Sequence, residues 1–286
     1  MRPDGRPGPR PPLHQPILPL FDEEELWIAR AAERFEDAEA EYLLAWALER
    51  FHPRLAISAA GGVDGMVLID IALRLRSDVR VFTLDTGRLP AETYALFERV
   101  RERYGIAVEF EYPETDAVAA VVTDHGPNLM FGGFDRRLRC CEIRKVEPLK
   151  RKLSTLDAWV AGLRRERWRS RRNIAKVELD RDHGGIVKLN PVADWTLDRV
   201  WDYVHEHDVP SHALFDQGYT SVGRAPCTRA VAPGEPERAG RWWWEQETDK
   251  ECGIHGSVGL LGSATDRERA AAMRDVDGRE RQGAAG

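Results

Sequence analysis

Hydrophobic positions along the chain follow two different spacings. Residues 23–50 have an acidic start and apolar side chains at helical intervals, which predicts one or two helices there. From residue 54 onward, short apolar runs alternate with helical stretches. We expect strands at 55–58, 79–84, 107–112, 158–163 and 186–190, and helices at 66–75, 91–104 and 197–205. This alternation predicts an α/β fold with an open, mostly parallel sheet flanked by helices.

The two ends of the chain differ in composition from its middle. The first residues are rich in Pro, Gly and Arg, and the last are small and polar. The expected parts are a disordered arm over 1–22, an α/β domain over 23–232, a mobile C-terminal segment over 233–262 packed on the same domain, and a flexible tail over 263–286.

Charge and hydropathy exclude some kinds of partner. The 286 residues include 42 Lys and Arg against 48 Asp and Glu, a net charge of −6, so a basic excess typical of nucleic-acid binding is missing. No apolar run reaches the length of a membrane span, and the N-terminus lacks the apolar core of a signal peptide. We therefore expect a cytoplasmic protein with no membrane or nucleic-acid partner. The sequence leaves its oligomeric state open, a homo-oligomer included.

Two loops follow the first two expected strands, where ligands bind in such sheets. The first has two adjacent glycines before a helix, so its backbone N–H groups and the helix dipole can hold a phosphate. The candidate binding residues are Ser58, Gly61, Gly62 and Asp64 in the first loop and Asp85, Thr86, Gly87 and Arg88 in the second. The alternative is that both loops serve only backbone geometry.

Four cysteines in a cytoplasmic chain favour metal binding or catalysis over structural disulfides. Cys252 lies close to Lys250 and to two glycines, a setting that suits a nucleophilic thiol. The adjacent Cys140 and Cys141 cannot easily close a relaxed disulfide but can serve two corners of an iron–sulfur cube. The third cysteine, Cys227, ends a segment with Cys-x-x-Cys spacing whose first position is Arg224, and arginine is a poor metal ligand.

Six arginines fall within the nine residues from 164 to 172. Such density is self-repelling unless anions lie nearby. It indicates either a solvated surface or a site for a phosphate- or sulfate-like anion, which arginine recognises through paired hydrogen bonds. For the aromatic run 242–244 we expect core packing or the anchor of a lid.

Several ordered motifs between residues 55 and 256 match one family. They are LDTGRLP at 84–90, CCEIRKVEPL at 140–149, GLRRE at 162–166, NPVADWT at 190–196, APCTRAV at 225–231, RAGRWWWE at 238–245 and ECGIH at 251–255. With these motifs the chain resembles the assimilatory adenylylsulfate (APS) reductases, close relatives of the phosphoadenylylsulfate (PAPS) reductases. The loop at 58–65 is similar to the Ser-Gly-Gly-x-Asp-Ser loop of adenylating enzymes, with Ala60 and Gly65 in the serine places.

The resemblance implies a fold of the adenine-nucleotide α-hydrolase (PP-loop) type and a definite chemistry. It implies thiol-dependent reduction of APS to sulfite and AMP through a thiosulfonate on the catalytic Cys252, with thioredoxin or a similar dithiol protein as donor and no flavin or nicotinamide. The activity belongs to sulfate assimilation and cysteine biosynthesis. The substrate-binding residues that it adds to those of the two loops are Lys145, Arg164, Arg171, Arg238, Arg241 and His255. It also implies a [4Fe-4S] cluster on Cys140, Cys141 and Cys227, with Arg224 in the fourth ligand position and the ligand set therefore incomplete.

Three alternatives stay open. The chain can be a PAPS reductase without a cluster, a degenerate adenylyl-nucleotide-binding protein without reductase activity, or an adenylating ATP pyrophosphatase. Arg224, which leaves the cluster ligands incomplete, suggests the first. The lost ligand, the Arg167-Trp168 pair in place of Gln-Ser and the altered serines of the first loop suggest the second. An ATP pyrophosphatase would use the glycine loop but would have no need for Cys252.

Overall fold

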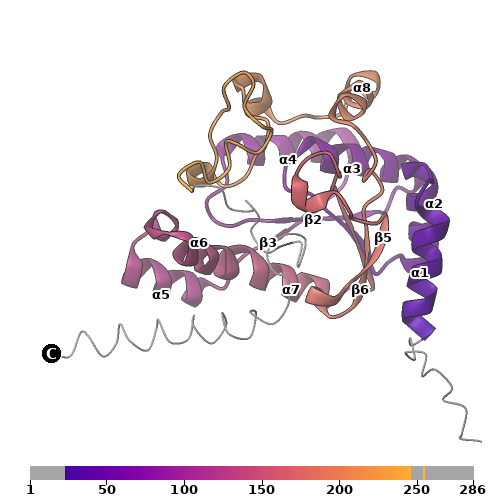
Figure 1. Cartoon of the computed structure of the whole chain (residues 1–286), viewed down its shortest axis with the longest axis horizontal. Helices are drawn as coiled ribbons and strands as arrows, with labels where there is room; N and C mark the ends of the chain where they lie inside the picture. The colour runs from indigo at the N-terminus through magenta and orange to yellow at the C-terminus, as the bar shows by residue number, and fades with distance from the viewer. Residues whose placement is uncertain (1–22, 246–253, 255–286) are drawn as a thin grey trace, which may run out of the picture.

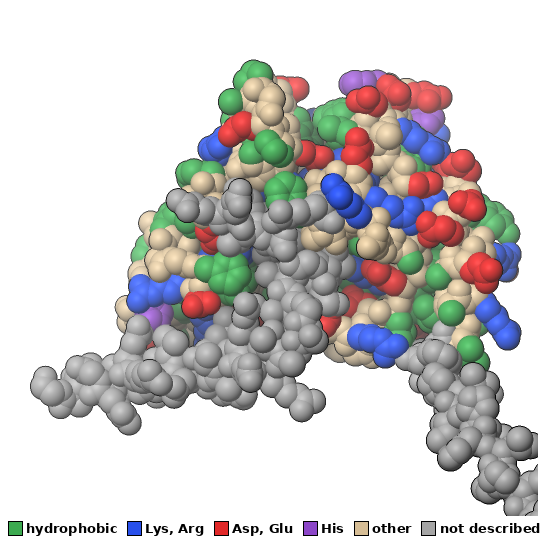
Figure 2. Space-filling view, viewed as in Figure 1, with side chains coloured by type: hydrophobic (Ala, Val, Ile, Leu, Met, Phe, Trp, Pro, Cys, Tyr) green, Lys and Arg blue, Asp and Glu red, His purple; other side chains and the backbone are tan. Residues whose placement is uncertain are grey.

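The structure is a computed structural model that describes residues 23–245 and Ile254 (Figure 1). The expectations for the arm, for the tail, and for Cys252 and His255 lie outside the described residues. Within the described range, no helix is both long and apolar enough to cross a bilayer. Figure 2 shows acidic and basic side chains interspersed over the described surface on one side of the molecule, in keeping with the near balance of the two charges in the sequence.

Six short strands form one open sheet. The strands are β1 (Leu55–Ser58), β2 (Arg80–Leu84), β3 (Val108–Glu111), β4 (Ala158–Ala161), β5 (Val177–Asp180) and β6 (Ile186–Leu189). They lie in the order β3-β2-β1-β4-β6-β5, and every neighbouring pair is parallel except β5 and β6. The expected open, mostly parallel sheet is confirmed, and each of the five expected strands ends within two residues of its expected bounds.

The edge strand β5 is not predicted by the sequence. Its four residues alternate apolar and acidic side chains over a stretch too short to be distinguished from a loop. It runs antiparallel to β6, with Val177 opposite Leu189 and Asp180 opposite Ile186. Glu178 pairs with Lys188 of β6 at 2.8 Å, and Asp180 accepts a hydrogen bond from Trp159 Nε1 of β4 at 3.0 Å, so both acidic side chains have partners within the sheet.

One face of the sheet shares the larger hydrophobic core with five helices. These are α1 (Glu23–Phe35), α2 (Ala40–Phe51), α3 (Val63–Leu75), α4 (Ala91–Tyr104) and α8 (Leu197–His207). Leu55 and Ile57, alternate residues of β1, join this core. Helix α3 is buried on almost every side, which explains its nearly continuous apolar sequence.

The opposite face is covered by a second helical layer, which lies below the sheet in Figure 1. It consists of α5 (Thr115–His125), α6 (Phe134–Cys141), the π-helical turn η2 (Glu142–Val146) and α7 (Glu147–Leu153). Leu149 and Leu153 of α7 pack against Ala56 of β1 and Trp159 of β4. The sequence does not predict this layer, because α5 buries no residue fully and several buried positions of α6 and η2 carry charged side chains, which hides the apolar period.

Helix ends follow local signals. Helix α4 ends at Gly105, which has φ 68° in the left-handed region that favours glycine. Helix α8 begins after Thr196, whose side chain accepts a hydrogen bond from the backbone N–H of Arg199 at 3.1 Å. Such signals explain why the expected bounds of these two helices agree with the structure to within two residues.

The chain after α8 forms loops that return to the second layer. Short 3-10 helices occur here and earlier in the chain: η1 (Leu129–Gly132), η3 (Arg169–Arg171), η4 (Arg181–His183), η5 (Ala213–Gln217) and η6 (Ala225–Cys227). Thr228 and Arg241 form a β-bridge, and Trp242 is completely buried in a small cluster with Cys140 and Cys227. The described residues of the segment after 232 therefore pack on the same body as the sheet.

Candidate active site

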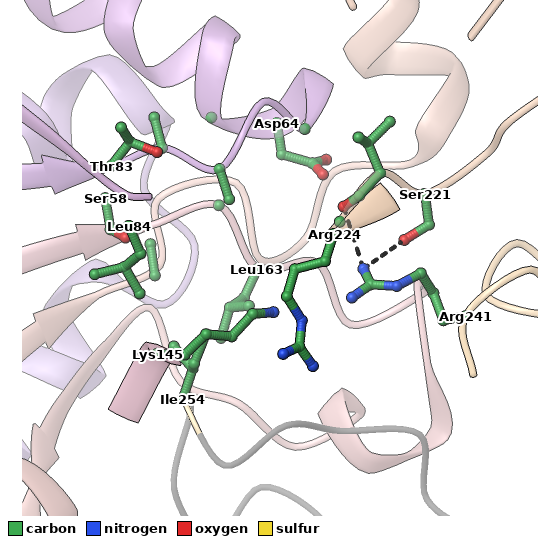
Figure 3. A pocket seen from close by; sticks show the side chains of 18 of the residues that line it. Ser58, Asp64, Thr83, Leu84, Lys145, Leu163, Ser221, Arg224, Arg241 and Ile254 are labelled. Carbon is green, nitrogen blue, oxygen red and sulfur yellow. Dashed lines mark hydrogen bonds between the residues drawn. The ribbon is translucent and has the colours of Figure 1, made fainter. Parts of the chain in front are cut away.

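A pocket opens at the carboxyl ends of β1, β2 and β4 (Figure 3). Strand order reverses here, because β2 and β3 lie on one side of β1 while β4, β6 and β5 lie on the other. Such a crevice is the usual ligand site of open α/β sheets. Ser58 ends β1, Leu84 ends β2 and Gly162 follows β4, and all three line the pocket.

The first predicted binding loop joins β1 to α3. Gly62 is the N-cap of α3, so the backbone N–H groups that the helix leaves unbonded belong to this loop. Gly61 has φ +79°, and a Cβ there would lie 3.2 Å from the His212 ring, so this turn requires glycine. Among the predicted residues of the loop, Ser58, Gly62 and Asp64 line the pocket, while Gly61 shapes the turn.

Asp64 is engaged by two arginines. Its Oδ1 accepts a hydrogen bond from Arg164 Nε at 2.5 Å, and its Oδ2 accepts one from Arg167 Nη1 at 2.6 Å. Arg164 is completely buried behind Asp64 and is not among the described lining residues. The two arginines also contact Glu237, at 3.3 Å and 2.8 Å. Asp64 and Arg164, both predicted substrate ligands, therefore form a buried ion network that fixes one wall of the pocket.

The second predicted loop is held by hydrogen bonds within the loop and to neighbouring segments. Asp85 Oδ1 accepts a bond from the Gly87 backbone N–H at 2.8 Å, and the Tyr94 hydroxyl donates to the same carboxylate at 3.0 Å. Burial together with this bond raises the pKa of Tyr94 to about 12. Arg88 donates to Asn128 Oδ1 at 3.0 Å. Of the four predicted residues of this loop, Thr86 is among the described residues that line the pocket. Asp85, Gly87 and Arg88 are not, and they orient the loop.

Cationic side chains dominate the pocket wall. Among the described lining residues, six carry a cationic side chain and one, Asp64, a carboxylate. The six are Lys145, Arg167, Arg171, Arg224, Arg238 and Arg241. Four of them, Lys145, Arg171, Arg238 and Arg241, are among the cations that the sequence analysis assigns to substrate binding, and the structure brings all four to one pocket from segments far apart in the chain. This charge imbalance makes the pocket suited to an anion.

Local structure holds these cations in place. Lys145 lies in the π-helical turn that directly follows the cysteine pair, and such turns often occur at functional sites. Arg241 Nη1 donates to the Val222 carbonyl at 3.2 Å, and its guanidinium lies 4.8 Å from the Trp242 ring centre. The Arg238 guanidinium lies 5.9 Å from the ring centre of Trp168. Figure 3 shows Lys145, Arg224 and Arg241 facing a common space.

The three described cysteines surround an arginine. Arg224 Nη1 donates to Cys140 Sγ at 2.9 Å, and Nη2 donates to Cys141 Sγ at 3.1 Å. Cys227 belongs to the same buried cluster. Among the described residues, no group of three or more Cys, His, Asp or Glu side chains is arranged to hold a metal ion. The predicted cluster ligands thus do not fit a [4Fe-4S] group, because a guanidinium bonds to two of the thiols.

Sequence reasoning misses several buried residues that support this site. Arg137 is completely buried, donates to Glu245 at 2.6 Å and lies 4.4 Å from the Trp242 ring centre, so it ties α6 to the C-terminal segment. Arg144 Nη1 donates to the Thr86 carbonyl at 2.7 Å, and burial lowers the pKa of this arginine. A basic residue in a charged helix carries no sequence signal of burial. Arg167, by contrast, lies in the arginine run that the sequence marks out.

The predicted nucleophile Cys252 and the predicted substrate ligand His255 lie outside the described residues. Ile254, from the same motif, is described, and it lines the pocket beside Lys145 (Figure 3). It also packs against the hydrophobic cluster that includes Leu163.

Comparisons with known proteins agree with this architecture. The model of the phosphoadenosine phosphosulfate reductase domain matches residues 54–230. An adenosine 5'-phosphosulfate reductase of Burkholderia cepacia is 46% identical over 213 residues, covering 74% of this chain and 84% of that protein. One of Allochromatium vinosum is 47% identical over 194 residues, covering 68% and 75%.

The fold has a solved counterpart. A crystal structure of phosphoadenylyl-sulfate reductase from Candida auris, a phosphate complex, superposes with a TM-score of 0.62 at 24% identity, covering 74% of this chain and 98% of that one. This likeness supports the open α/β architecture. The domain match and the identity to the bacterial reductases show that the chain belongs to the phosphoadenosine phosphosulfate reductase domain family.

Proposed function

We propose that this chain reduces APS to sulfite and AMP in sulfate assimilation and cysteine biosynthesis, with electrons from thioredoxin or a similar dithiol protein. The observation that carries the proposal is the pocket of six cationic side chains and one carboxylate, found at the ligand crevice of a chain of this family. APS joins a phosphate to a sulfate, and both groups are anions that arginine and lysine bind well. Identities of 46% and 47% to proteins named adenosine 5'-phosphosulfate reductase favour APS over PAPS.

The pocket offers two sets of groups to the single phosphate of APS and to the sulfate joined to it. The loop at 58–62, at the start of α3, suits the adenylyl phosphate, because a helix N-terminus favours an anion. Lys145, Arg171, Arg238 and Arg241 suit the phosphosulfate end. They stabilise the charge that develops on the phosphate as it becomes the leaving group. His255, as a further substrate ligand, is part of the proposal on sequence grounds.

Cys252 is the proposed nucleophile. Its thiolate attacks the sulfur atom of APS, an S–S bond forms, and the bond between sulfur and the bridging oxygen breaks. AMP leaves with the electron pair of that bond, and a thiosulfonate remains on Cys252. Support comes from the position of Ile254, which lies two residues after Cys252 in the chain and lines the pocket.

A dithiol completes the cycle. One thiolate of the donor attacks Cys252 Sγ, sulfite leaves with the electron pair of the S–S bond, and a mixed disulfide forms. The second donor thiol then releases Cys252 as a thiolate. The donor supplies both electrons, so the scheme needs no flavin, nicotinamide or iron–sulfur step. A reducing, cytoplasmic setting belongs to the proposal, since Cys252 must start each cycle as a free thiol.

The test is turnover of APS and PAPS by the full chain with reduced thioredoxin, followed as sulfite and AMP release. We expect turnover with APS and its loss in Cys252→Ser, which should keep its circular dichroism spectrum. Turnover of PAPS but not of APS would assign the chain to the PAPS reductases. A folded protein that binds AMP but reduces neither compound would contradict the proposal and indicate an adenylyl-binding protein.

A further inference from the structure

Arg224 is held rigidly at the meeting point of the three described cysteines. It is the N-cap residue of η6, and its carbonyl accepts bonds from the Cys227 backbone N–H at 2.9 Å and from the Thr228 hydroxyl at 3.0 Å. The backbone N–H of Ala225 bonds to the Arg88 carbonyl at 2.9 Å. The side chain is completely buried, so its two bonds to Cys140 and Cys141 are a fixed feature of the core.

The guanidinium keeps its charge in this setting. Arginine stays protonated in proteins. A permanent cation therefore stands among three thiol groups that would otherwise be available to a metal.

A cluster and this guanidinium exclude each other. A [4Fe-4S] group needs thiolate sulfur at its corners, and its irons are cations. Arg224 donates hydrogen bonds to two of the sulfur atoms, Cys140 Sγ and Cys141 Sγ. It also places a positive charge where the iron atoms of a cluster would lie. It also removes the fourth ligand, because the Cys-x-x-Cys spacing that ends at Cys227 begins with this arginine.

The same side chain belongs to the substrate pocket. Arg224 lines the pocket together with Lys145 and Arg241, and Figure 3 shows its side chain running between theirs. Its buried Nε has no hydrogen-bond partner among the described residues. A buried donor of this kind is costly unless a bound group satisfies it.

We propose that Arg224 takes the position of an iron–sulfur cluster and serves as a built-in cation of the pocket, which makes the site independent of metal. The guanidinium contributes to binding the phosphosulfate end of the substrate from the side where the thiols lie. The binding role rests on the proposed function, whereas the replacement of the cluster does not.

Iron content tests the replacement without reference to activity. The full chain is purified anaerobically, incubated with ferrous iron and sulfide, desalted, and assayed for iron, acid-labile sulfide and visible absorption. We expect the unaltered chain to retain little iron. Arg224→Cys removes the cation and completes a four-thiol set, so it should gain about four irons per chain and the broad absorption of a cluster. Arg199→Cys, at an exposed arginine paired with Glu39, is the matched control and should gain none.

Two results would overturn the replacement. One is a stoichiometric cluster in the unaltered chain. The other is a folded Arg224→Cys variant that takes up no more iron than Arg199→Cys, since the thiols would then not converge on a common site.

Binding of APS to chains that also carry Cys252→Ser tests the second role, because turnover is blocked. Arg224→Met should weaken APS binding about tenfold or more, and Arg224→Lys should weaken it less because it keeps the charge. The Met variant should fold, since uncharged thiols pack as small apolar groups. Unchanged APS affinity in folded Arg224→Met would refute the binding role. Absence of APS binding in the parent with Arg224 intact would instead refute the proposed function.

Discussion

The network around Asp64 offers a quantitative test of how the pocket wall is built. The substitution is Asp64→Asn, which keeps the shape of the side chain and removes its charge. The Asp64 side chain is 2% exposed, that of Arg164 is 0% exposed and that of Arg167 is 11% exposed. The variant therefore leaves two buried guanidinium groups with Glu237 as their remaining common carboxylate, at 3.3 Å and 2.8 Å.

The magnitude follows from this geometry. Removing one partner of a buried ion pair costs about 3–5 kcal/mol, because a buried charge loses its compensation. Both arginines still contact Glu237, Arg164 also pairs with Glu166 at 3.3 Å, and the Asn oxygen can still accept one hydrogen bond, so the lower end applies. We expect Asp64→Asn to lower the free energy of unfolding by about 3 kcal/mol.

The assay is urea unfolding followed by tryptophan fluorescence and circular dichroism, with the denaturant slope checked for each variant. The matched control is Asp157→Asn, which removes the partner of Arg54 in a pair where both side chains are 53% exposed. An exposed pair of this kind contributes at most about 1 kcal/mol. Equal losses of unfolding free energy in Asp64→Asn and Asp157→Asn would show that the ion network around Asp64 stabilises the fold no more than an exposed pair does.

Three further predictions concern other residues. Burial lowers the pKa of His212 below 6.5, so the stability it contributes is present above that pH and is lost as the pH falls through the lower, folded-state pKa. His212→Gln should flatten the acid side of the stability profile by up to about 1.4 kcal/mol per pH unit, and an unchanged profile would contradict this. Lys145→Gln should raise KM for APS about tenfold, and a KM within twofold of the parent would argue against contact with the substrate. Asp70→Asn should lower the free energy of unfolding by about 2 kcal/mol, because Asp70 accepts bonds from the Tyr104 and Tyr203 hydroxyls at 2.9 and 2.8 Å; a loss below about 0.5 kcal/mol in urea unfolding would refute this.

The sequence predicts the parallel core of the fold well, because its strands are buried apolar runs separated by helices with clear periods. Strand β1, with Leu55 and Ile57, and helix α3 are examples. It does not predict the α5–α7 layer, because Arg137, Arg144 and Lys145 occupy buried positions there. Their burial is compensated by partners far away in the chain, such as Glu245 for Arg137, and periodicity cannot show such partners.

The sequence predicts which residues lie at the candidate site better than it predicts what each of them does. The motifs bring Lys145, Arg238 and Arg241 to one pocket, as expected for an anion site. Asp85 and Arg164 are selected by the same motifs, yet they support the pocket from behind through hydrogen bonds. Residue type and spacing indicate that a side chain lies near a site, whereas contact depends on rotamers and tertiary partners.

The contacts of Arg224 are likewise beyond what the sequence can predict. The sequence analysis identifies Arg224 as an unsuitable residue in the fourth position of a ligand set whose other three members are cysteines. The two hydrogen bonds that it donates to Cys140 and Cys141, and its complete burial, can be found only in three dimensions.

The intact mass of the protein after anaerobic mixing with APS, in the absence of any reductant, tests the proposed chemistry most directly. We expect the addition of one SO3 group, carried by the peptide that contains Cys252 and absent from Cys252→Ser. The adduct should disappear when reduced thioredoxin is added, with release of sulfite. Folded protein that gains no adduct with APS or with PAPS would contradict the thiosulfonate mechanism.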